Sequence, residues 1–347
     1  MRRLIASYFL SFVSLAVAKP AFAEVETDES KYVVYQGAEG PGAGKHVVLL
    51  AGDHEYRSEE ALVQLAKILS FRHGFRSTVL FSLDPKDGTI RPDIDNSLPG
   101  AELLETADAM VLGLRFRKFP DEVMQHFVDA YLAGKPIVAL RTSTHAFNFP
   151  PKVKSKFPEY SYRAKQWPGG FGRQVLGETW VSHLGKNHKE ATLSIATDAA
   201  KEHPVMRGVG EIFAYSGAYA VNPMEDSTIL MRAQVLAGMQ PDSPLESKGK
   251  NDPLQPVVWT REHKNAAGNT NRVVCTTMGA ATDLLDEDMR RLLVNGVYWG
   301  LAMEVPSKAD AQVIGNYEPT DYGFGTFRKG VKPADLAMTR EQALAGE

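Results

Sequence analysis

The segment Gly134-Lys-Pro-Ile-Val-Ala-Leu-Arg-Thr-Ser-Thr-His-Ala-Phe147 decides the fold class of this chain. Its apolar run, Ile137 to Leu140, predicts a buried strand that stops abruptly in polar residues. In open α/β sheets, ligands bind outside the carboxyl ends of the strands. The turn after this strand offers Arg141, hydroxyl groups and His145, but no cysteine. We therefore expect a small-molecule site at this turn that lacks a thiol nucleophile.

The sequence around this segment alternates buried strands with amphipathic helices. Further buried strands are predicted at residues 46–51, 77–81, 109–112, 257–260 and 273–277. Helices are predicted to begin near Ser58, Phe119 and Asp286. Strand, helix and strand in this order indicate right-handed parallel crossovers. The predicted fold class is therefore α/β, with a doubly wound, mostly parallel sheet.

The first 23 residues have the pattern of an export signal. A basic start at Met1–Arg3 precedes an apolar run from Leu4 to Ala18, and small residues follow at 21–23. This apolar run is too short to span a membrane comfortably. We expect cleavage, a periplasmic or secreted location and no stable membrane anchor afterwards; an uncleaved anchor is the alternative. The single cysteine, Cys275, excludes an intramolecular disulfide.

Local composition divides the rest of the chain. Residues 24–44 are polar and end in glycines, which indicates a linker. Residues 45–303 carry the α/β pattern, and residues 304–347 predict a polar wrapping tail. Residues 148–190 lack periodicity and are interpreted as an irregular lid insertion over the carboxyl edge of the sheet. With a net charge of −3 we expect no nucleic-acid partner, because binding nucleic acid needs a strongly basic surface. A homo-oligomer is compatible with the sequence.

Several motifs, taken in their order along the chain, resemble the ThuA-like (trehalose-utilisation) family. They are Ala51-Gly-Asp-His-Glu55, Leu112-Gly-Leu-Arg-Phe-Arg117, Leu140-Arg-Thr-Ser-Thr-His-Ala-Phe147, Gly177-Glu-Thr-Trp-Val-Ser-His183 and Arg290-Arg-Leu-Leu-Val-Asn-Gly-Val-Tyr-Trp299. The resemblance covers residues 45–303 and implies a class I glutamine amidotransferase-like fold, a flavodoxin-like sandwich. The tail, with Phe324-Gly-Thr-Phe-Arg-Lys-Gly330, is similar to that of secreted, planctomycete-type members.

The resemblance implies a small-molecule carbohydrate as the partner, because the family is named after operons in which disaccharides pass through 3-keto intermediates. Compared with a glutaminase turn, the nucleophile position falls near Arg141, which cannot attack a carbonyl. Cys275 lies in a predicted apolar strand, so we predict no glutaminase activity. Many members carry Gly-His where this chain has Gly279-Ala280. The role of that histidine must therefore be absent from this chain or be filled by another residue.

Polar residues after the first and third strands are candidates for ligand binding. Asp53, His54 and Glu55 place carboxylates beside an imidazole, which suits proton transfer or metal ligation. A solvated loop is the alternative interpretation of these three residues. One arginine after the third strand, with Arg115 as our candidate, is expected to hold a carboxylate, a phosphate or a sugar hydroxyl.

In the turn after residues 137–140, His145 is the candidate ligand-binding donor or general acid and base; a structurally bonded histidine is the alternative. Ser143 lies only two residues away, and the chain has no Gly-x-Ser-x-Gly signature, so a serine hydrolase is not predicted. We expect the Ser143 hydroxyl to contact the ligand or to satisfy backbone groups of the turn.

The insertion contains the richest cluster of polar and aromatic residues. Glu178, Trp180, His183 and His188 could stack on and bond a sugar. Alternatively, Glu178, His183 and His188 could ligate a divalent metal, or the histidines could pin the loop. No cofactor other than this metal is suggested. Tyr215 is a candidate for the rim of the same site.

The first hypothesis is an exported enzyme of carbohydrate catabolism that acts on a glycoside or a 3-keto sugar by acid/base chemistry. Its predicted proton-transfer residues are His145, His183, Asp53 and Glu178. Its predicted substrate-binding residues are Arg141, His54, Glu55, Arg115, Ser143, Trp180, His188 and Tyr215. The alternatives are a non-catalytic sugar-binding protein and a metal-dependent hydrolase.

Overall fold

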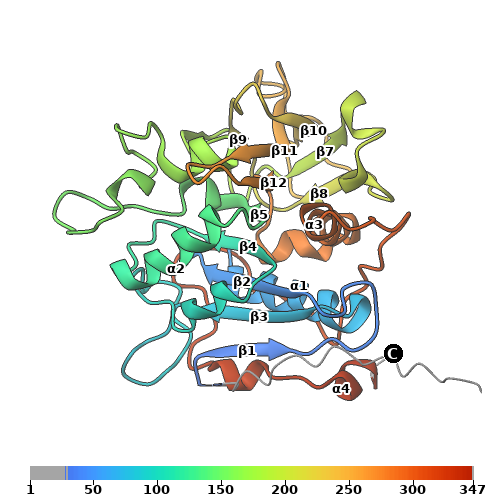
Figure 1. The fold of residues 1–347 in the computed structure, drawn as a ribbon. Coiled ribbons are helices and arrows are strands. Elements are labelled where there is room, and N and C mark those ends of the chain that lie inside the picture. Colours follow the sequence, from blue (N-terminus) through green and yellow to red (C-terminus); the bar gives the residue numbers. More distant parts are fainter. Residues whose placement is uncertain (1–27, 29, 346–347) are drawn as a thin grey trace, which may run out of the picture.

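A mixed β-sheet forms the centre of the computed structural model, which describes residue 28 and residues 30–345. Within this part of the chain the sheet has ten strands (Figure 1). In spatial order they are β1 (Tyr32–Tyr35), β3 (Arg76–Phe81), β2 (His46–Gly52), β4 (Ala109–Leu114), β5 (Ile137–Leu140), β12 (Thr270–Thr276), β11 (Gln255–Lys264), β10 (Thr228–Val235), β7 (Thr192–Ala196) and β8 (Ile212–Ala214). Two short strands, β6 (Ser182–His183) and β9 (Tyr219–Ala220), pair separately.

The parallel pairing is confined to the middle of the sheet. Strands β3, β2, β4, β5 and β12 run parallel to one another, whereas β1 and the strands from β11 to β8 pair antiparallel. All seven residues of β2 and all six of β4 are buried, as expected for strands covered on both faces. The predicted α/β class is confirmed, but a mostly parallel sheet describes only the central block.

Helices cover the two faces of this block. Helices α1 (Ser58–His73) and α3 (Glu287–Gly300) contribute to one hydrophobic cluster, and α2 (Asp121–Leu132) contributes to the other. Asp286 accepts hydrogen bonds from the backbone N–H groups of Asp288 and Met289 and so caps α3. The short turns include η1 (Ala101–Glu105) and η2 (Arg141–His145), and helix α4 (Arg340–Leu344) ends the described chain.

Part of the segment interpreted as a linker belongs to the sheet. Residues Tyr32–Tyr35 form the edge strand β1, which pairs with β3. The glycines that follow pack tightly, because a Cβ on Gly37 would lie 2.3 Å from backbone atoms of Gly74. The interpretation of residues 24–44 as a linker is therefore corrected for residues 32–44. The strand was missed because four residues between polar flanks give no clear period.

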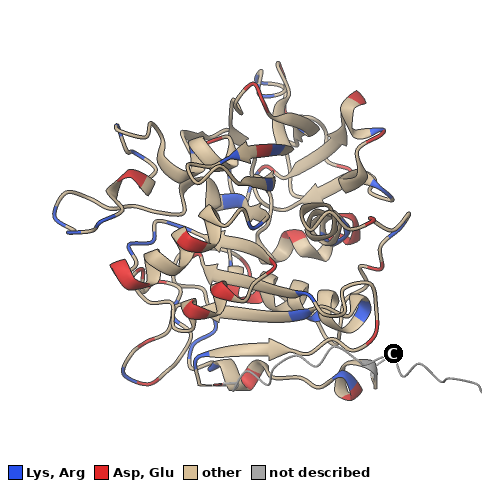
Figure 2. Cartoon of the chain, in the orientation of Figure 1, with Lys and Arg blue, Asp and Glu red and all other residues tan. Residues whose placement is uncertain are grey.

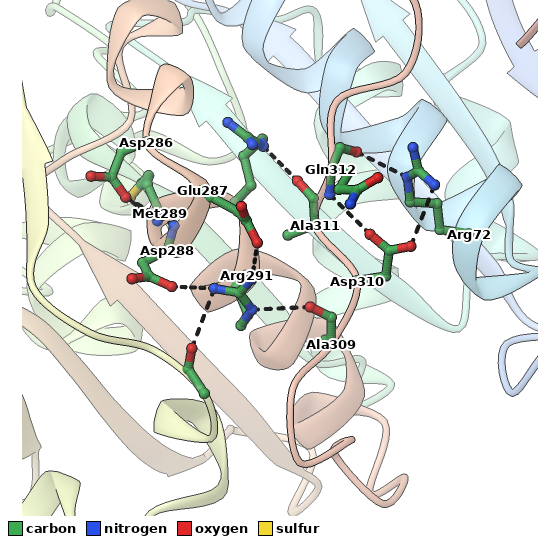
Figure 3. A network of polar contacts seen from close by, with 12 residues as sticks. Arg72, Asp286, Glu287, Asp288, Met289, Arg291, Ala309, Asp310, Ala311 and Gln312 are labelled. Atoms are coloured by element: carbon green, nitrogen blue, oxygen red, sulfur yellow. Dashed lines mark hydrogen bonds and ion pairs between the residues drawn. The ribbon is translucent and has the colours of Figure 1, made fainter. Parts of the chain in front are cut away.

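The C-terminal tail crosses the helices that cover one face of the sheet. Arg291 Nε donates to the carbonyl of Ala309 at 3.0 Å, and Arg72 Nε donates to that of Gln312 at 3.0 Å (Figure 3). Arg290 Nε donates to the carbonyl of Ala311 at 2.6 Å. Three arginines of α1 and α3 thus hold the backbone carbonyls of three tail residues, Ala309, Ala311 and Gln312.

Basic and acidic side chains are interspersed over the fold (Figure 2). No helix in residues 30–345 is long and apolar enough to cross a membrane. The predicted signal peptide lies outside the described residues.

We predict that Arg290→Met lowers the free energy of unfolding by about 2–3 kcal/mol, because buried carbonyls of Leu284 and Ala311 lose a charged donor. Urea titration measures the change. The matched control is Arg340→Met at an exposed position, for which a change within about 0.5 kcal/mol is expected. Equal effects of both variants would contradict this account of the tail.

A second prediction concerns pH. His46 bonds the hydroxyls of Thr106 and Thr78, and burial, followed by the charge of Arg76, lowers its pKa to about 4. The unfolded chain, with a histidine pKa of about 6.5, binds a proton that the folded state does not bind between these values. Stability contributed by neutral His46 is therefore present above pH 6.5 and is lost as the pH falls towards 4. His46→Gln should reduce the slope of unfolding free energy against pH in this window, by up to about 1.4 kcal/mol per pH unit.

Candidate functional site

Three turns meet at the carboxyl edge of the parallel block. Asp53 to Glu55 follow β2, Arg115 and Phe116 follow β4, and η2 follows β5. The hydroxyl of Thr142 donates to the Asp53 carboxylate at 2.5 Å, and the Phe116 N–H donates to the carbonyl of His145 at 3.0 Å. These bonds join the three turns, as the sequence led us to expect for parallel strands that end together.

The turn after β5 begins in a strained conformation. Arg141 has a φ of 42°, in the left-handed region that non-glycine residues rarely adopt. Its side chain is 1% exposed and donates to the carbonyls of Thr277 at 2.7 Å and Gly217 at 3.1 Å. The guanidinium lies between the rings of Tyr56 and Tyr219, 3.9 and 4.6 Å from their centroids. Arg141 therefore lies beneath the site, and this burial does not support its predicted contact with a substrate.

His145 lies in the centre of the site and is 2% exposed. Its Nδ1 is 3.1 Å from the Thr144 hydroxyl, which in turn donates to the carbonyl of Arg141 at 3.3 Å. Since the hydroxyl proton is used there, we assign the imidazole proton to Nδ1, so that Nε2 carries a lone pair. Within the described residues Nε2 has no hydrogen-bond partner. Burial, followed by the charges of Arg115 and Arg141, holds the pKa of His145 well below its usual range.

Aromatic rings surround His145. The ring centroids of Phe116, Trp180, Tyr219 and Tyr162 lie 4.8, 5.5, 6.2 and 6.3 Å from that of His145. His183 is exposed at the rim and packs edge-on against Trp180 and Tyr219. Partial burial, followed by the charges of Arg141 and Arg115, lowers the pKa of His183. The structure thus brings three of the predicted residues, His145, Trp180 and His183, together.

The sequence did not single out Phe116, Tyr162 and Tyr219. Phe116 has a φ of 51°, which no sequence pattern reveals, although it stands inside the motif that ends at Arg117. Tyr162 lies in the irregular insertion, and Tyr219 lies in the two-residue strand β9. Neither segment has a periodicity from which the direction of a side chain could be inferred.

A polar group lies next to the aromatic rings. His54 Nε2 is 2.6 Å from Nη1 of Arg115, and His54 Nδ1 is 3.1 Å from Nη2 of Arg117. Glu55 pairs with Nη2 of Arg115 at 3.1 Å. Burial, followed by the charge of Arg115, lowers the pKa of His54 to about 4, so this imidazole is neutral at pH 7.

The C-terminal tail forms a wall of this polar group. The Gly323 N–H donates to the carbonyl of Glu55 at 2.6 Å, and the Phe324 ring lies 5.3 Å from the ring of His54. The guanidinium of Arg115 lies 5.1 Å from the Phe324 centroid, while 63% of Phe324 is exposed. A wrapping tail was predicted, but its contact with the site was not.

Several predicted site residues have structural partners instead. The Ser143 hydroxyl donates to the carbonyl of Leu112 at 2.8 Å and so ties η2 to β4. The Asp53 carboxylate accepts the N–H groups of Glu55 and Tyr56 besides the Thr142 hydroxyl. These contacts do not support substrate binding by Ser143 or proton transfer by Asp53.

The predicted metal ligands do not converge. The Glu178 carboxylate, which is buried, binds Arg173 at 3.1 Å and the N–H groups of Thr179 and Asn222 at 2.8 and 2.5 Å. His188 stacks on Tyr322, with centroids 4.3 Å apart. Among residues 30–345 no three His, Cys, Asp or Glu side chains are grouped as metal ligands. The set Glu178, His183 and His188 is therefore corrected, and Glu178 is not placed for proton transfer.

Two further residues belong to hydrophobic clusters. Tyr215 packs with Tyr56 and with Tyr322 of the tail in a small cluster. Cys275 is fully buried in β12, and burial raises the pKa of its thiol well above the usual range. Cys275 is therefore an inert core residue.

Comparison with solved structures finds matches at low sequence identity. A protein from Parabacteroides merdae matches with 17% identity and a TM-score of 0.47, over 85% of this chain and 99% of that one. A protein from Bacteroides uniformis matches with 15% identity and a TM-score of 0.40, over 78% and 96%. Both are described as ThuA-like.

An exo-beta-1,4-mannosidase from Opitutaceae bacterium strain TAV5 also matches, with 10% identity and a TM-score of 0.32, over 74% of this chain and 35% of that one. No protein-family model and no curated protein matches the chain.

The hydrogen bonds of His145 predict its tautomer. In ¹H–¹⁵N spectra at pH 7 we expect a neutral ring with the proton on Nδ1, because Thr144 accepts it and burial opposes the charge. Thr144→Val should shift the ring nitrogens towards a mixture of tautomers, whereas Thr144→Ser, which keeps the hydroxyl, should not. An imidazolium, or a wild-type ring with the proton on Nε2, would contradict the assignment.

Proposed function

We propose that this chain is an exported ThuA-like protein of carbohydrate catabolism, with a doubly wound sandwich and residues 148–190 as a lid over its site. It binds a small sugar, either a glycoside or a 3-keto derivative, and His145 acts as its general base. The observation that carries this proposal is that Nε2 of a neutral His145 has no hydrogen-bond partner among the described residues and lies inside a ring of aromatic side chains.

The aromatic rings suit a sugar because C–H faces of a pyranose pack against π faces, as other apolar surfaces do. Trp180 and Tyr162 are only partly buried, so their rings are accessible to a ligand. His183 at the rim can bond a hydroxyl. Side chains of this kind recognise a neutral polyol without needing a metal ligand set.

The chemistry that fits is the removal of a proton by His145. A neutral imidazole with its lone pair on Nε2 can accept a proton from carbon next to a keto group or from a hydroxyl. The negative charge that develops on the keto oxygen needs a donor, and Arg115 is the cation on the rim of the site. Glutamine hydrolysis is not part of the proposal, since Arg141 occupies the strained turn and Cys275 is buried in a strand.

A non-catalytic sugar-binding protein is the second candidate. The observation that favours it is that both carboxylates predicted for proton transfer, Asp53 and Glu178, are fully used in structural bonds. Of the four residues predicted for proton transfer, only His145 and His183 then remain available.

The test is turnover and affinity of the mature protein with trehalose and its 3-keto derivative. His145→Gln should lower turnover by about 10²–10⁴ while affinity stays within about threefold. Trp180→Ala should weaken affinity, and the control His126→Gln, on α2, should change neither.

Equal loss of affinity and turnover in His145→Gln, or binding without turnover in the wild type, would favour the non-catalytic candidate. Failure of a wider panel of disaccharides and keto sugars to bind would overturn both.

A further inference from the structure

The two ring nitrogens of His54 both face hydrogen-bond donors, and a neutral ring cannot accept from both. Both ring nitrogens face guanidinium N–H groups, at 2.6 Å for Arg115 and 3.1 Å for Arg117. A neutral imidazole has one acceptor nitrogen and one N–H, so it can accept only one of these donors. In either tautomer one N–H group therefore points at another N–H group, which is unfavourable.

Arg117 cannot relieve this conflict because it is fixed. It is fully buried, its Nε donates to the carbonyl of Arg115 at 2.6 Å, and its Nη1 donates to the carbonyls of Pro92 and Ile94 at 3.0 Å. We therefore assign the His54 lone pair to Nδ1, where Arg117 donates. The proton is then on Nε2, directed at Arg115.

Arg115 is the movable partner. It is held by Glu55 at 3.1 Å, and in the described chain its Nε has no hydrogen-bond partner. Its guanidinium lies 4.6 Å from the ring centroid of Phe116 and 5.1 Å from that of Phe324, and Phe324 is an exposed side chain of the tail. A ligand atom that accepts hydrogen bonds could enter between Arg115 and Nε2–H of His54, and would then accept from both.

The two hydrogen-bond donors beside this gap, Arg115 and Nε2–H of His54, favour an anion in that position. The nearest carboxylates already have partners: Glu55 pairs with Arg115, and Asp53 accepts two backbone N–H groups and the Thr142 hydroxyl. Charge-assisted hydrogen bonds to an oxyanion are stronger than bonds between neutral groups.

We infer that the ligand of this site carries an oxyanion, which binds between Arg115 and His54 beneath Phe324. The inference rests on the proposed function and makes the sugar an acidic one, with a carboxylate or a phosphate. The pyranose ring would lie towards Trp180 and His145, and the acidic group would lie towards the tail.

Isothermal titration with matched sugars tests the inference: D-glucuronate against D-glucose, D-galacturonate against D-galactose, and glucose 6-phosphate as the phosphate arm. The acid of a pair should bind about tenfold or more tightly than its neutral partner at low salt. The preference should decrease strongly in 1 M salt, where the screening length is about 3 Å. This salt series needs only the wild-type protein.

Three variants test which side chains cause the preference for the acidic sugar. Arg115→Met should abolish the preference for the acid, because the oxyanion loses its charged donor. The matched control is Arg163→Met, an exposed arginine over Tyr162, which should keep the preference. Phe324→Ala, at a mostly exposed position, should weaken binding of the acid without affecting folding.

The outcomes separate the two proposals. Preference for glucose 6-phosphate that is lost in Arg115→Met supports the site and identifies the oxyanion as phosphate. Equal binding of acid and neutral sugars, or a preference that survives in Arg115→Met, overturns the inference and leaves the sugar site standing. Absence of binding by every acid, neutral and keto sugar overturns the inference and the proposed function together.

Discussion

The hydrogen bond from Thr142 to the Asp53 carboxylate is the interaction on which the site depends. It joins the turn after β5 to the turn after β2, and the same carboxylate orders the backbone that carries Glu55 and Tyr56. Because Asp53 is only 2% exposed, loss of one partner would leave a buried carboxylate with too few donors. Its saturation explains why Asp53 supports the neighbouring residues and does not act on a ligand.

The site combines a rigid floor with walls from less regular segments. The floor consists of turns at the ends of parallel strands, which are fixed by the sheet pairing. Trp180 comes from the insertion, Tyr219 from a two-residue strand and Phe324 from the tail. Such an arrangement lets the walls vary in chemistry while the position of His145 is kept by the core.

Sequence patterns identified the floor better than the walls. Ile137 to Leu140 could be recognised as a buried strand because four apolar residues precede a polar turn, and η2 follows it directly. Arg141 was misjudged because a left-handed φ turns a residue in a direction that strand alternation does not describe. Glu178 was selected because it lies close in sequence to Trp180 and His183, whereas the N–H of Asn222 that binds its carboxylate is brought near only by the fold.

The attachment of the tail has a consequence for the order of assembly. Phe324 follows the last strand of the sheet by almost fifty residues, and the tail between them is held by arginines of α1 and α3 (Figure 3). Every strand therefore leaves the ribosome before the residue that closes the polar end of the site. During synthesis all strands of the sheet are thus available for pairing before Phe324 has been made, so the polar end of the site is the last part of it to be completed.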